Sequence, residues 1–143
     1  MLITTGIPDN EDIITRKPPE ERLKKGPVVM IECFQKIPCN PCYTACKRGA
    51  IQEFKDINDT PAVDFDKCNG CALCVSKCPG LAIFVIDETF SECEAAVSLP
   101  FEFLPIPKAG EMVSLLNRGG KKVGQGKVLK IRNSKYDDRT PVI

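Results

Sequence analysis

The sequence predicts an α+β fold with a pseudo-twofold (βαβ)2 core, an extended N-terminal arm and a small C-terminal β unit. Three observations predict this organisation: residues 27–87 repeat themselves, each repeat places a cysteine-rich loop between short apolar runs, and the flanking segments differ from the repeat in composition. Self-similar units within one chain usually share one core.

Residues 1–26 are predicted to form an extended docking arm. They are polar and charged, contain three prolines and lack a sustained apolar period of 2 or 3.6 residues. Two interpretations remain open for this arm. It is either a frayed terminus or an anchor on a partner subunit through its isoleucines, Ile3, Ile7, Ile13 and Ile14.

Residues 27–90 are predicted to form the core domain. The first half of the repeat runs PVVMIE, Cys33, a loop, Cys46 and GAIQEF, and the second runs PAVDFDK, Cys68, a loop, Cys78 and GLAIFVID. The order of residues in each half is typical of a strand, a metal-binding loop, a short helix and a second strand. Four strands are therefore expected, at residues 28–31, 51–54, 62–65 and 82–86. So small a unit buries little apolar surface, and a bound metal cofactor would supply much of its folding free energy.

Residues 91–143 are predicted to form a Pro-rich connector and a small β extension. The prolines of SLPFEFLPIPKAG favour extended backbone. A run at 112–116, a turn at 117–120, a break at 124–126 and a second run at 128–132 indicate a hairpin or part of a small barrel. A solvated face or docking rim is expected from the basic residues Lys121, Lys122, Lys127, Lys130 and Arg132.

The second cysteine loop has the pattern C-x2-C-x2-C-x3-C-P, made by Cys68, Cys71, Cys74, Cys78 and Pro79. This spacing lets three thiolates hold three irons of one cubane, while the fourth cysteine ligates the neighbouring cluster. Zinc is the alternative metal. Zinc sites usually take two well separated cysteine pairs, which this loop does not have.

The first cysteine loop is less regular, with the pattern C-x5-C-x2-C-x3-C. Lys36 stands where an unmodified motif has its first cysteine, but Cys33 follows its strand much as Cys68 follows the other. Cys33 is therefore the expected ligand, with three residues inserted after it. The alternative is that Cys33 is only a small buried hydrophobe, which would leave three thiolates and favour a [3Fe-4S] or labile centre.

Two [4Fe-4S] clusters with crossed ligation are predicted from these loops. The ligands of cluster 1 are expected to be Cys33, Cys39, Cys42 and Cys78. Those of cluster 2 are expected to be Cys68, Cys71, Cys74 and Cys46. The ninth cysteine, Cys93, has no spaced companion and is expected to be a structural thiol.

Composition excludes other chemistry. The chain has no histidine, so a Cys2His2 zinc site, a Rieske centre and imidazole catalysis are excluded. A net charge of +1 with 6% aromatics and no Trp argues against nucleic-acid binding. No apolar run is long enough to cross a bilayer, and no secretory signal is recognisable, so we expect a cytoplasmic protein without direct membrane insertion. Its cysteines are then not expected to form disulfides.

The core resembles the bacterial two-[4Fe-4S] ferredoxins. The close match is VDFDKCNGCALCVSKCPGLAI, and IPCNPCYTACKRGAI is a variant half in which Lys47 replaces the proline after the fourth cysteine. This resemblance implies a ferredoxin-like bicluster core.

Most of the chain is also similar to the small ferredoxin-like subunit of multi-subunit FAD-dependent amine or amino-acid dehydrogenases, of the proline, hydroxyproline or opine type. The similarity lies in KGPVVMIECFQKIPCNPC, LPFEFLPIP and GEMVSLLNRGGKKVGQGKV. It implies a non-catalytic subunit that relays single electrons to or from flavin-containing subunits of a hetero-oligomer. The alternatives are a free-standing ferredoxin and a structural or regulatory iron-sulfur or zinc module. Autonomous catalysis is disfavoured, since the chain lacks a Gly-rich nucleotide loop and a nucleophile-base pair.

Overall fold

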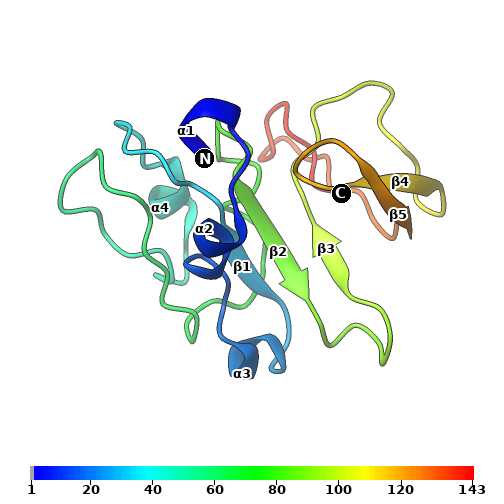
Figure 1. The fold of residues 1–143 in the computed structure, drawn as a ribbon, viewed down its shortest axis with the longest axis horizontal. Helices are drawn as coiled ribbons and strands as arrows, with labels where there is room; N and C mark the ends of the chain where they lie inside the picture. The colour runs from blue at the N-terminus through cyan, green and yellow to red at the C-terminus, as the bar shows by residue number, and fades with distance from the viewer. Residues whose placement is uncertain (1) are drawn as a thin grey trace.

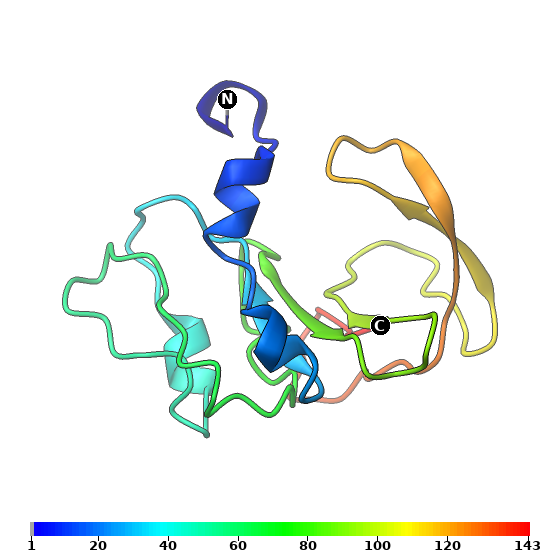
Figure 2. The same cartoon turned by 60° about the horizontal axis from the view of Figure 1, so that its bottom comes forward.

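The computed structural model describes residues 2–143, which form a small mixed α/β structure with two antiparallel sheets (Figures 1 and 2). The helices are α1 (Leu2–Thr5), α2 (Asn10–Ile14), α3 (Glu20–Leu23) and α4 (Pro41–Ala45). The strands are β1 (Val28–Ile31), β2 (Ile83–Asp87), β3 (Ala96–Ser98), β4 (Met112–Leu116) and β5 (Lys122–Lys127). One sheet has the order β1-β2-β3, and the other pairs β4 with β5.

The central sheet joins the first and last strands predicted for the repeat. β1 pairs antiparallel with β2, so that Val28 lies opposite Ile86 and Ile31 opposite Ile83. All of β1 is buried, which suits a run of β-branched and apolar residues covered on both faces. The side chains of Val29 and Ile31 pack with Ile51 and Val75 of the two cysteine-rich halves in one core. The predicted outer strands are thus confirmed, β2 being shifted by one residue.

The prediction of two regular inner strands is wrong. Residues 51–54 and 62–65 form only one antiparallel bridge, between Ile51 and Val63. Two backbone hydrogen bonds flank this bridge, and the exposed residues beyond Ile51 find no further strand partner among residues 2–143. Within residues 51–65, only Ile51 and Val63 therefore pair, and a longer ladder of hydrogen bonds does not form.

The short helix predicted for the second half of the repeat is also wrong, because no helix lies in the described residues between α4 and β2. Residues 73–77 form successive turns, in which Val75 N donates to Ala72 O at 3.2 Å and Lys77 N donates to Cys74 O at 3.2 Å. A helix nucleus is costly to form, and Pro79 disfavours helical backbone at the residue before it. The backbone hydrogen bonds of this short segment therefore join residues three apart, and no α-helix forms within residues 73–77.

The N-terminal arm is not extended, because residues 2–26 contain three short helices. In α2, Asp9 and Asp12 form a reciprocal capping box, which explains why a helix begins in so polar a segment. The arm ends inside the core, where Leu23 is 1% exposed. Its far end is different, since Ile3 is 98% exposed and Ile14 70% exposed. Figure 2 shows α1, in dark blue, at the end of the arm away from the central sheet.

The C-terminal extension contains the predicted hairpin, but its second strand is misplaced in the prediction. β5 spans residues 122–127 and includes the glycines expected to form a break, whereas residues 128–132 form no regular strand. A Cβ on Gly126 would lie 3.1 Å from Leu115 Cδ2, so the bare glycine lets Leu115 lie across β5. The glycines therefore permit this pairing.

The chain returns to the core after the hairpin. Arg132 bridges Val142, and the backbones of Leu99 and Ile143 exchange hydrogen bonds of 2.9 and 3.0 Å. Val142 is 5% exposed and belongs to the same core as β1 and β2. Both extensions are thus packed onto the cysteine-bearing unit. In residues 2–143, no helix has the length and apolar character needed to cross a membrane.

Candidate metal centres

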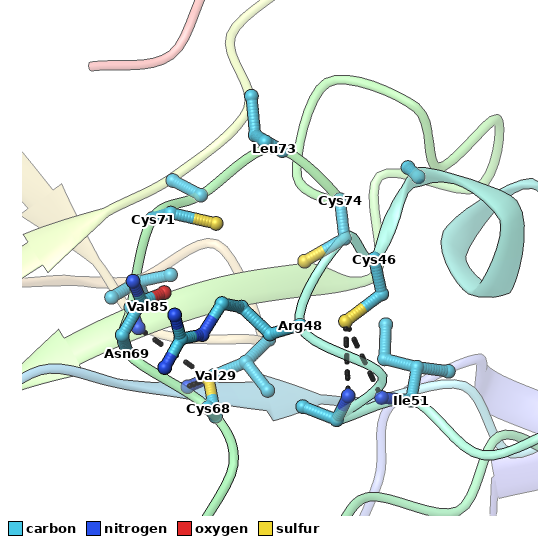
Figure 3. Close-up of a pocket in the computed structure, with 14 residues that line it drawn as sticks. Val29, Cys46, Arg48, Ile51, Cys68, Asn69, Cys71, Leu73, Cys74 and Val85 are labelled. Carbon is cyan, nitrogen blue, oxygen red and sulfur yellow. Dashed lines mark hydrogen bonds between the residues drawn. The ribbon is translucent and has the colours of Figure 1, made fainter.

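Two hollows of similar size contain the cysteines of the repeat. The first has about 350 Å³ of space, and apolar residues such as Val29, Ile51 and Val85 line it. Figure 3 shows four sulfur atoms around this hollow, three from the second loop and one from the first. They belong to Cys68, Cys71, Cys74 and Cys46.

The second hollow has about 370 Å³ of space, and its apolar wall includes Ile31, Phe54 and Ile83. Its cysteines are Cys33, Cys39, Cys42 and Cys78. Each hollow therefore takes three cysteines from one loop and the fourth from the other. These linings correspond to the two predicted ligand sets, while ligation itself stays a prediction.

Backbone N–H groups point at the cysteine sulfurs. Five of these contacts measure 3.3 to 3.5 Å: Ala50 N and Ile51 N to Cys46 Sγ, Val29 N and Gly70 N to Cys68 Sγ, and Ala82 N to Cys78 Sγ. Such donors stabilise negative charge on sulfur. The backbone of both halves is thus arranged to support thiolates.

The surroundings oppose thiolate formation when no cation is present. Burial raises the pKa of Cys74 to about 12 and that of Cys42 to about 11, and neighbouring cysteines act in the same direction. Burial also raises the pKa of Cys33. A cationic iron-sulfur core would replace the protons and compensate the buried negative charge. The thiol-only donor sets, the apolar walls and the N–H groups therefore fit [4Fe-4S] clusters.

The second cysteine loop, which lines the first hollow, has unusual backbone conformations. Gly70 has φ of +68°, and a Cβ at this position would lie 2.6 Å from Pro27 Cβ. Ala72 has φ of 59°, although it is not a glycine. Left-handed residues let a tight loop turn its N–H groups inward. The need for Gly70 and the conformation of Ala72 cannot be read from the cysteine spacing.

Arg132, in the C-terminal extension, donates hydrogen bonds to backbone carbonyls of this loop. This finding corrects the prediction that Arg132 lies on a solvated face or docking rim. Its Nη1 donates to Cys71 O at 3.2 Å and its Nη2 donates to Ala72 O at 2.8 Å. Its Nε donates to Asp137 Oδ1 at 2.9 Å, and Asp137 is 1% exposed. Burial acts to raise the pKa of Asp137, but hydrogen bonds from Ser134 and Arg132 outweigh it and lower that pKa to about 2.

Arg22, in the N-terminal arm, contacts the same loop. No role was predicted for this residue from the sequence. Its guanidinium donates to Cys68 O at 2.6 Å and Phe65 O at 2.8 Å, and to the carbonyls of Gly26 and Pro27 at 3.0 Å each. Arg22 is 9% exposed. Nothing in the sequence separates it from neighbouring solvated charges such as Lys24, which is exposed.

Cys93 is exposed and lines neither hollow. Within residues 2–143, no group of three or more Cys, Asp or Glu side chains is close enough together to hold a single metal ion.

Comparison with known proteins places residues 37–82 in the family described as the 4Fe-4S dicluster domain. The chain is 42% identical over 52 residues to pyruvate synthase subunit PorD of Methanocaldococcus jannaschii, covering 36% of this chain and 58% of that protein. It is 35% identical over 63 residues to the ferredoxin-type protein NapF of Haemophilus influenzae, covering 41% of this chain and 36% of that protein.

A third relative, translation initiation factor rli1 of Schizosaccharomyces pombe, is 32% identical over 113 residues, which are 68% of this chain but 19% of that protein. The chain thus spans 58% or less of the length of these curated relatives. No solved structure matches the chain.

These findings define the class of the matched domain. Residues 37–82 form a 4Fe-4S dicluster domain of the ferredoxin type, and the cofactors of the chain are two [4Fe-4S] clusters. This segment of the chain is accordingly an iron-sulfur domain of the ferredoxin type. Cys33 lies before the matched residues, so its role rests on the lining of the second hollow.

Proposed function

We propose that this chain is the non-catalytic electron-transfer subunit of a cytoplasmic hetero-oligomeric oxidoreductase. It would relay single electrons to or from flavin-containing subunits, with an FAD-dependent amine or amino-acid dehydrogenase as the expected assembly. Cluster 1 is held by Cys33, Cys39, Cys42 and Cys78. Cluster 2 is held by Cys68, Cys71, Cys74 and Cys46.

The observation that carries this proposal is the pair of hollows with crossed cysteine sets. Cys46 and Cys78, the last cysteines of their loops, each line the hollow that holds the other loop's three cysteines. Because β1 and β2 contribute alternate residues of one face to the two hollows, the two clusters would lie next to one another along the same pair of strands. That arrangement favours passage of an electron from one cluster to the other.

A place in a larger assembly is supported by the extensions and by the relatives. The β4–β5 hairpin exposes Met112, Leu116 and Val123, which are 61 to 64% accessible. Exposed apolar side chains of this kind are frequent at protein interfaces. One relative carries the name of a pyruvate synthase subunit. The similarity of KGPVVMIECFQKIPCNPC and the hairpin sequence to dehydrogenase subunits favours a flavoprotein partner.

The first test is chemical analysis of protein purified without oxygen. We expect about eight irons and eight sulfides per chain, together with visible absorbance that dithionite bleaches and air or a mild oxidant restores. Zinc instead of iron, or a cluster destroyed on reduction, would leave only a structural or regulatory metal module. Four irons per chain would contradict the crossed assignment.

The second test is recovery of the native complex from its source cells by a tag on this chain. We expect a flavin-containing subunit to co-purify in fixed ratio and to reduce the clusters when its substrate is added. A matched control carries the tag on a chain without residues 112–127, with its iron content checked. A monodisperse monomer that exchanges electrons with flavoproteins only by collision would indicate a free-standing ferredoxin.

A further inference from the structure

We propose that the N-terminal arm sets the potentials of the two clusters separately, Arg16 acting on cluster 1 and Arg22 acting on cluster 2. This inference rests on the ligand assignment made under the proposed function. It gives the arm a role in the redox chemistry itself, in addition to any docking role. Arg16 precedes α3 and Arg22 lies within it, in the part of the arm that joins the core.

Arg22 brings a buried positive charge to the cluster 2 loop. Its Nη2 lies 2.6 Å from the carbonyl oxygen of Cys68, and its Nε lies 2.8 Å from that of Phe65. The Cys68 sulfur also accepts backbone N–H groups from Val29 and Gly70. A guanidinium held this close to a ligand cysteine stabilises the cluster state that carries one more electron.

Arg16 occupies a comparable place beside the cluster 1 loop. Its Cζ lies 5.6 Å from the ring centroid of Phe34, the residue after Cys33. Its Nη1 donates at 3.4 Å to the carbonyl of Pro61, which lines the second hollow. The Nε of Arg16 is buried and has no hydrogen-bond partner in the described part of the chain.

Two other arginines near the loops, Arg132 and Arg118, differ because a carboxylate compensates each of them. Arg132 pairs with Asp137 at 2.8 Å, and Arg118 forms a bidentate pair with Glu32. Within residues 2–143, neither Arg16 nor Arg22 has a carboxylate at ion-pair distance. Arg48 also lines the first hollow, but it is exposed. The arm therefore supplies the two uncompensated cations that are held beside the loops by hydrogen bonds to core carbonyls.

Two residues of one short segment would therefore act on different clusters. Loss of the Arg22 charge would lower the midpoint potential of cluster 2 and leave that of cluster 1 in place. Loss of the Arg16 charge would do the reverse. Movement of the arm on a partner would then change both potentials together, since one segment carries both cations.

The test compares Arg16→Gln and Arg22→Gln with Lys17→Gln and Lys24→Gln. Each variant removes one positive charge from the arm, but Lys17 and Lys24 are exposed. Midpoint potentials would be measured by redox titration with EPR detection on protein whose iron content matches the wild type. Each arginine variant should lower one midpoint, by about tenfold in the ratio of reduced to oxidised cluster, or about 59 mV. The two variants should lower different midpoints, and the lysine variants should change neither.

The inference is overturned if both arginine variants shift the same midpoint, if neither shifts one, or if the lysine variants shift them equally. Should Arg22→Gln lose iron, Arg22→Lys keeps the charge and replaces the guanidinium contacts. Full iron with a nearly unchanged midpoint in Arg22→Lys supports the charge effect, whereas a tenfold fall overturns it. A wild type without two reversibly reducible clusters would instead refute the proposed function.

Discussion

Ala50 donates its backbone N–H to the sulfur of Cys46 at 3.3 Å, and Ala82 makes the equivalent bond to Cys78 at 3.4 Å. Each donor follows its cysteine by four residues, and the residue before each donor has positive φ, 64° at Gly49 and 52° at Leu81. The same local turn therefore presents the last cysteine of each loop to the hollow formed mainly by the other loop.

Replacing Cys46 with Ser should damage cluster 2, although Cys46 belongs to the first loop. Its sulfur lies with those of the second loop in the first hollow, and the serine oxygen is a harder and less suitable iron ligand. EPR of the reduced protein should show loss or alteration of one cluster signal. Cys78→Ser is the reciprocal variant and should alter the other signal. Both substitutions altering the same signal would contradict the crossed assignment.

Replacing Cys93 with Ser should leave the iron content at its wild-type value. Cys93 is exposed and lies in neither hollow, so it has no metal to hold. In the apo-protein, a thiol reagent at neutral pH should modify Cys93 faster than Cys74, because burial raises the pKa of Cys74 to about 12. A drop in iron in Cys93→Ser would make this residue a ligand and reopen the role of Cys33.

Replacing Gly70 with Ala should be far more damaging than replacing Gly49 with Ala. Both glycines have positive φ, +68° and +64°, so both substitutions meet the same left-handed penalty of about 1 kcal/mol. At Gly70 the new Cβ would also meet Pro27 at 2.6 Å, whereas nothing lies within 4 Å at Gly49. We expect Gly70→Ala to lower the thermal midpoint more and to lose iron from cluster 2. Equal effects of the two variants would show that space at Gly70 is not limiting.

Asp137 should stabilise the protein throughout the neutral range. Its folded pKa is lowered to about 2, below the usual 3.8, so its contribution is present above about pH 4 and is lost as the pH falls toward 2. Asp137→Asn should lower stability by roughly 2 kcal/mol, because Arg132 keeps its charge beside the loop and loses its partner. The difference in thermal midpoint between the two proteins should be constant from about pH 5 to pH 8. A difference that grows steadily between pH 5 and pH 8 would indicate that another group governs this pair.

The parts of the fold that local sequence determines were predicted well. β1 and β2 are short apolar runs bounded by glycine and proline, and both were predicted as strands, while their pairing is seen only in the structure. The inner strands and the second helix were predicted from the same pattern, but they are too short to form without partners. The second strand of the hairpin was misplaced since its glycines were interpreted as a break, while Gly126 makes room for Leu115.

The cysteine spacing by itself determined the cofactor class, because ligand number and order along a short loop fix which sulfurs can reach one cubane. Only the tertiary structure decided which charges hold those loops. Arg22 and Arg132 look like ordinary surface residues in the sequence, yet both donate to carbonyls of the loop around Cys68 and Cys71. Backbone carbonyls are present at every position, so no sequence pattern marks the ones a distant guanidinium reaches. That choice depends on how the two extensions pack against the core.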